Sequence, residues 1–147
     1  MRALRGQLLR LRGDPFLPPF AERPEDAIAF ESDGAVVMDG GVIKAAGPAG
    51  EVLAGVPPEA VDHYPAGLIL PGFIDAHVHY PQLGVIASYG EQLLDWLQRY
   101  TFPEEARFED PDLCAAVAEL FLDELLRHGV TSACAYSTVH AASAEAL

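Results

Sequence analysis

The sequence has few cysteines and no long uninterrupted apolar run. Two cysteines, Cys114 and Cys134, are too few for a disulfide framework or a paired-cysteine zinc motif. We interpret both as small buried hydrophobic residues in a reducing cytoplasm. The apolar stretches 68–74 and 113–122 contain Pro, Gly or Glu and fall short of the roughly 20 residues that a membrane span requires. The sequence therefore predicts a cytoplasmic protein without a membrane-spanning helix.

Basic side chains are also scarce. Nine Lys and Arg residues stand against 22 Asp and Glu residues in 147, which gives a formal charge of −13 at pH 7. Such an acidic chain repels nucleic-acid phosphates and anionic lipid, and we expect neither nucleic acid nor membrane as a partner. Arginines within the first 12 residues interrupt the apolar segment that a secretory signal needs. A small neutral substrate is compatible with this charge.

The first part of the sequence is typical of β-structure. The apolar run 35–38 and the alternating run 42–46 flank Asp39-Gly40-Gly41, which predicts a hairpin because glycine tolerates positive φ. Four prolines between residues 14 and 24 exclude a helix or a central strand there. We expect a small β-unit over residues 1–65.

The pattern changes at residue 68. Residues 68–70 and 73–79, separated by Pro-Gly, form an apolar run that indicates a strand covered on both faces in a parallel sheet. Leucines at helical spacing follow in residues 91–100.

A second helix and strand come next. Asp110 can cap a helix that Pro111 opens and Gly129 ends, and residues 130–139 predict the following strand. Strand, helix and strand in this order indicate the α/β fold class. The sequence stops inside a further helix that begins at Ala141, so we expect the N-terminal portion of a longer protein.

A His-x-His pair is the candidate for chemistry. His77 and His79 lie two residues apart on a predicted strand, so both side chains leave the same face, which Asp75 shares, and they can converge on one ion. A catalytic zinc uses three or more protein ligands, so two histidines are an incomplete site. A bare His-x-His is more often a pair of ordinary strand histidines. Here its position at the end of an apolar strand, after Pro-Gly-Phe-Ile-Asp, favours a metal site.

Residues 71–79, PGFIDAHVH, resemble the first-strand motif of the amidohydrolase superfamily, whose members are metal-dependent hydrolases. The hairpin at 36–43 resembles the superfamily's β-sandwich. This resemblance implies a distorted (β/α)₈ TIM-type barrel preceded by a small β-sandwich, with the barrel incomplete in this chain. Residues 1–65 would form the β-sandwich part, and residues 66–147 would form the first two βα units.

Within the superfamily, three segments are similar to the guanine deaminases. They are HYPQ at 79–82, QLLDWL at 92–97 and YTFPE at 100–104. The similarity implies that His77 and His79 are metal ligands and that Gln82 hydrogen-bonds the purine. An amide suits this task because it offers a donor and an acceptor, as does the lactam edge of guanine. Trp96 is a candidate for the pocket wall, with a position in the hydrophobic core as the alternative.

The implied reaction is zinc-dependent hydrolysis of guanine to xanthine and ammonia in purine catabolism, by an enzyme that is commonly a homodimer. One zinc ion would lower the pKa of bound water, and iron is an alternative because imidazole suits both metals. The remaining ligands and the general acid and base would follow Leu147. We therefore assign no catalytic residue in this chain and expect the isolated chain to be inactive.

Two alternatives remain open. One is another deaminase or hydrolase of the same superfamily that acts on a purine, pyrimidine or triazine. The other is a truncated, non-catalytic binding or assembly module. Among the other histidines, we interpret His140, at the end of the second strand, as structural, and we exclude His63 and His128 as ligands.

Overall fold

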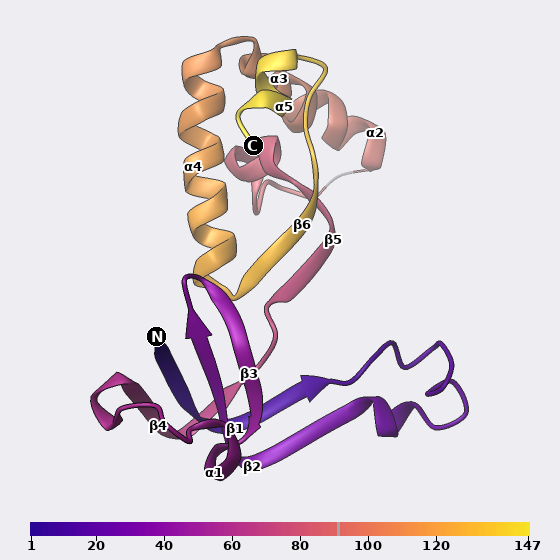
Figure 1. Ribbon diagram of the computed structural model, residues 1–147. Helices are drawn as coiled ribbons and strands as arrows, with labels where there is room; N and C mark the ends of the chain where they lie inside the picture. Colours follow the sequence, from indigo (N-terminus) through magenta and orange to yellow (C-terminus); the bar gives the residue numbers. More distant parts are fainter. Residues whose placement is uncertain (91) are drawn as a thin grey trace. The chain divides into compact units, whose positions relative to one another are not determined.

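A computed structural model of the protein describes residues 1–90 and 92–147 (Figure 1). The chain divides into two compact units, Met1–Pro71 and Gly72–Leu147. The sequence pattern placed this boundary between residues 65 and 66. It falls later in the structure because Leu68 and Ile69 pair with the first strand, opposite Gln7 and Leu8.

The first unit contains a four-stranded sheet in the order β3-β2-β1-β4. Its strands are β1 (Arg2–Leu11), β2 (Ile28–Asp39), β3 (Val42–Pro48) and β4 (Val61–Ile69). Three single turns connect them: η1 (Pro24–Ala27), α1 (Ala49–Val52) and η2 (Pro58–Ala60). The β1–β2 and β2–β3 pairs are antiparallel, and β1–β4 is parallel.

The predicted hairpin is confirmed. β2 and β3 are joined at Gly40 and Gly41, whose φ angles of 59° and 78° lie in the left-handed region that glycine adopts without steric cost. The proline-rich segment 14–23 forms turns, as expected, because proline removes the backbone donors that a strand or helix requires.

The second unit is built on two parallel strands, β5 (Phe73–His79) and β6 (Val130–Tyr136). Between them lie η3 (Tyr80–Val85), α2 (Leu93–Trp96), the π-turn η4 (Leu97–Thr101), α3 (Phe102–Ala106), η5 (Arg107–Glu109) and α4 (Pro111–Arg127). A short helix, α5 (Ala141–Glu145), follows β6. This order confirms mixed α/β structure. None of the helices in the described ranges combines the length and hydropathy needed to cross a bilayer.

The core of the second unit lies between α4 and the segment that follows β5. Its buried residues are Tyr80, Phe108, Cys114, Ala118 and Phe121. The ring of Tyr80 meets Phe108 edge-on at 5.4 Å between centroids, and its hydroxyl donates to the carbonyl oxygen of Ser143 at 2.6 Å. Burial raises the pKa of the Tyr80 hydroxyl, which favours the protonated donor. The residue after the His-x-His pair is therefore fixed by both packing and a hydrogen bond.

The predicted ends of α4 are confirmed. The Asp110 carboxylate accepts from the backbone N–H of Asp112 at 2.9 Å, Pro111 occupies the first turn, and Gly129 has a φ of 78°. These features satisfy groups that a helix end leaves without intrahelical partners.

Three expectations need correction or restriction. β6 ends at Tyr136 rather than residue 139, because the chain turns toward α5. Cys134 is exposed on β6, so its interpretation as a buried residue is wrong, whereas Cys114 is buried. The helix expected over 91–100 is α2 followed by a π-turn, and Glu91 lies outside the described residues.

Replacing Asp110 by Ala removes the side-chain acceptor at the start of α4. We expect the free energy of unfolding to fall by about 1 kcal/mol, the usual contribution of such a cap. Urea denaturation followed by circular dichroism measures this loss. Asp123→Ala, on an exposed face of the same helix, is the matched control. Equal stability of the two variants would contradict the capping role.

Candidate functional site

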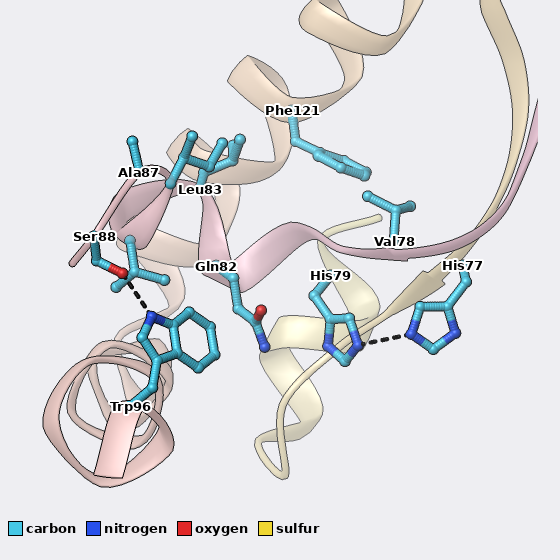
Figure 2. A pocket seen from close by; sticks show the side chains of 11 residues that line it. His77, Val78, His79, Gln82, Leu83, Ala87, Ser88, Trp96 and Phe121 are labelled. Atoms are coloured by element: carbon cyan, nitrogen blue, oxygen red, sulfur yellow. Dashed lines mark hydrogen bonds between the residues drawn. The ribbon is translucent and has the colours of Figure 1, made fainter. Parts of the chain in front are cut away.

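His77 and His79 lie at the C-terminal end of β5. Residues on a strand alternate in direction, and Figure 2 shows both imidazoles on one side of the chain with Val78 on the other. The two Nε2 atoms approach to 3.3 Å, and the ring centroids are 5.2 Å apart. The strand period therefore brings two ring nitrogens to one point, as the sequence predicted.

This spacing fits two ligands of a single metal ion. Two imidazole nitrogens at about 2.0–2.1 Å from a tetrahedral zinc are about 3.3–3.4 Å apart. The observed separation of 3.3 Å agrees with that requirement. His77 is exposed and His79 is half-buried, so the nitrogens are reachable from solvent. The distance is therefore compatible with both nitrogens binding one ion.

Tyr136 supports both rings from the neighbouring strand. It lies opposite His79 in the parallel pair. Its ring stacks on His79 at 4.8 Å with an interplanar angle of 15°, and lies 4.6 Å from the ring of His77. These contacts limit rotation of the imidazoles. The sequence analysis missed Tyr136, although the C-terminal ends of parallel strands meet at one edge of a sheet.

Asp75 shares the strand but has a different partner. Its carboxylate accepts from the backbone N–H of His77 at 3.0 Å, and the strand pairing is irregular between Asp75 and Val78. Within 1–90 and 92–147, no group of three or more His, Cys, Asp or Glu residues is arranged to hold a metal. Among the described residues, His77 and His79 are therefore the candidate ligands.

A cavity of about 410 Å³ adjoins the histidine pair (Figure 2). Its walls are mostly apolar and include few polar groups, as is usual for small-molecule sites. It is lined by His77, Val78, His79, Gln82, Leu83, Val85, Ile86, Ala87, Ser88, Trp96 and Phe121. The structure therefore brings all four site residues inferred from the sequence to one cavity.

Two side-chain hydrogen bonds position the cavity's polar and aromatic groups. The amide nitrogen of Gln82, on η3, donates to Oε1 of Glu105 on α3 at 3.0 Å. The indole N–H of Trp96, on α2, donates to Oγ of Ser88 at 2.8 Å. Trp96 thus lies in the cavity wall. The sequence analysis missed Glu105 and Ser88, since no local pattern indicates these pairings.

The remaining histidines lie elsewhere. His140 does not end the second strand, because β6 stops at Tyr136; it precedes α5 and lines a separate cavity of about 290 Å³. The Nδ1 atom of His128 lies 2.8 Å from the carbonyl oxygen of Glu124 at the end of α4. His63 is in β4 of the first unit.

The class of protein follows from this strand-end site and from a sequence comparison. The profile of the Amidohydrolase family matches residues 68–147, which include β5, β6 and every residue of the cavity. The chain belongs to this family.

Its similarity to particular relatives is more specific. It is 47% identical over 87 residues to the guanine deaminase of Escherichia coli K12, covering 59% of this chain and 20% of that protein. It is 42% identical over 143 residues to the probable guanine deaminase of Deinococcus radiodurans, covering 94% of this chain and 31% of that protein. It also matches the E. coli guanine deaminase structure with a TM-score of 0.88 and 36% identity, covering 100% of this chain and 34% of that one. The aligned part of the chain thus covers between 20% and 34% of the length of these relatives.

Replacement of His77 or His79 by Ala tests the metal centre. We expect each variant of the complete protein to bind zinc at least about 100-fold more weakly, because a direct ligand is lost. Competition with a chelating dye measures the affinity. His128→Ala, which removes an exposed histidine from the end of α4, should retain zinc. Unchanged affinity in both strand variants would exclude this site.

Proposed function

We propose that this chain is the N-terminal part of a zinc-dependent enzyme that hydrolyses guanine to xanthine and ammonia. The observation that carries the proposal is the convergence of His77, His79 and Gln82 on one cavity. The similarity to guanine deaminases supports the choice of substrate. In this proposal the first unit belongs to a small β-sandwich and the second unit to the first two βα units of a distorted (β/α)₈ barrel.

His77 and His79 are the residues that would hold the metal ion. Their 3.3 Å Nε2 separation supports a shared ion, and imidazole nitrogen suits zinc as well as iron. When bound, the ion supplies the Lewis acidity that activates water for hydrolysis near neutral pH. Tyr136 keeps the two rings in place from β6.

Gln82 and Trp96 would bind the purine. Gln82 offers a carbonyl oxygen and an N–H to the lactam edge of guanine, which carries the complementary donor and acceptor. Trp96 provides a flat apolar surface for a planar ring. Guanine is neutral, so the charge of −13 does not oppose its binding.

The general acid and base are assigned outside these 147 residues. The relatives are about three times as long as this chain, and we propose that their further length corresponds to the missing ligands and proton-transfer groups. We further propose a cytoplasmic homodimer for the complete enzyme.

Purification of the complete enzyme that carries this sequence, followed by loading with zinc, tests the function. We expect release of ammonia and formation of xanthine from guanine, and loss of both on chelation. Adenine, cytosine and melamine serve as comparison substrates. Preferential turnover of one of these, with none of guanine, would replace the substrate assignment with another member of the family.

Gln82→Ala tests the substrate contact. Loss of a hydrogen-bonding edge inside a cavity should lower kcat/KM for guanine by about 10- to 100-fold. Steady-state kinetics at constant zinc content measure this effect. Gln98→Ala changes an exposed amide on η4 and should leave kcat/KM unchanged. Equal kinetics of the two variants would remove Gln82 from the substrate site.

A further inference from the structure

The Gln82 amide has an acidic partner that does not line the cavity. Glu105 lies 23 positions along the chain, yet its Oε1 is 3.0 Å from Nε2 of Gln82, and both residues are half-buried. Glu105 is not among the residues that line the cavity, whereas Gln82 lies in its wall between Trp96 and His79 (Figure 2). Glu105 therefore acts on any ligand through Gln82.

In a glutamine side chain without a partner, the positions of the amide oxygen and the amide nitrogen are not fixed. Rotation by half a turn about its last side-chain bond exchanges the oxygen and the nitrogen at almost unchanged shape. One orientation presents the order of donor and acceptor that a 6-oxopurine edge requires, and the other presents the order that a 6-aminopurine edge requires. A free glutamine could thus bind either edge.

The Glu105 carboxylate removes this freedom. A carboxylate only accepts hydrogen bonds, so the atom of Gln82 that faces it is the amide nitrogen. The reversed amide would place an oxygen against a carboxylate oxygen and would lose a charge-assisted hydrogen bond. The carbonyl oxygen of Gln82 and its second N–H are left for the cavity.

We propose that Glu105 is a positioning residue that locks the orientation of the Gln82 amide and so makes the cavity select 6-oxopurines over 6-aminopurines. This inference rests on the proposed function, because it takes Gln82 as the residue that contacts the purine edge.

The fold holds Glu105 where this role requires it. Its neighbour Glu104 lies directly over Gly84 of η3, where a Cβ would overlap the Glu104 carboxylate. Glu104 also pairs with Arg107 at 2.7 Å. Helix α3 therefore packs against η3, the element that carries Gln82. This packing gives the Glu105 carboxylate a defined position.

Glu105→Gln in the zinc-loaded complete enzyme tests whether Glu105 fixes the orientation of the Gln82 amide. The substituted amide can donate to or accept from Gln82, so both orientations become available without a change of shape. Hypoxanthine and adenine are the probes, since they present the two edges and neither carries a 2-amino group. We expect the dissociation constant of adenine divided by that of hypoxanthine, both measured by calorimetry, to fall by about tenfold toward one, with zinc content unchanged.

The matched control is Glu109→Gln, which makes the same isosteric change at an exposed carboxylate on η5 and leaves Gln82, Glu104 and Glu105 intact. It should keep the wild-type ratio. If Glu105→Gln does not fold, Glu105→Ala removes the same acceptor and should give the same fall in the ratio.

An unchanged ratio in a folded Glu105 variant would overturn the inference, as would equal binding of both purines by the unaltered enzyme. These outcomes are separate from failure of the proposed function, which is the absence of ammonia release from guanine by the unaltered enzyme. Neither probe carries the 2-amino group that the proposed reaction removes, so the binding ratio is measured independently of that reaction.

Discussion

The site depends on the parallel pairing of β5 and β6. This pairing ends both strands at one edge and sets Tyr136 opposite His79, so that one aromatic ring lies against both imidazoles. The strand period then aims His77 and His79 in the same direction, and their nitrogens meet at 3.3 Å. A shift of one residue along β5 would turn both imidazoles to the other face.

The rest of the cavity is assembled from short segments between β5 and α4. Single turns this short have little stability of their own, so tertiary contacts must fix them. Here those contacts are three hydrogen bonds, in which Trp96 donates to Ser88, Gln82 to Glu105, and Tyr80 to Ser143. Each joins residues that are distant in sequence or on different elements. Gln82 is therefore oriented by a partner that does not line the cavity, and Trp96 by a partner in the cavity wall.

The sequence predicted the features that depend on local rules. The alternation at His77 and His79, the glycines at 40 and 41, and the Asp110 cap each follow from the conformation of a few adjacent residues. Tyr136 and Glu105 could not be found in this way, because their roles arise from contacts across the fold.

The sheet that residues 68–70 join and the exposure of Cys134 could not be predicted from the local pattern. Apolar residues 68–70 suit a strand, but their sequence does not say which sheet they join, and Leu68 pairs with Gln7 of the first unit. Cys134 lies on a strand whose pattern is apolar, yet it is exposed in the described unit. Between His79 and Gln82, by contrast, local chemistry fixes the geometry: Tyr80 and Pro81 are fully buried, and proline restricts φ. The histidine pair and the Gln82 amide are thus separated by two anchored residues, so the backbone sets the distance between the proposed metal-binding and purine-binding groups. In the proposal, only the orientation of the amide is set from outside this segment, by Glu105.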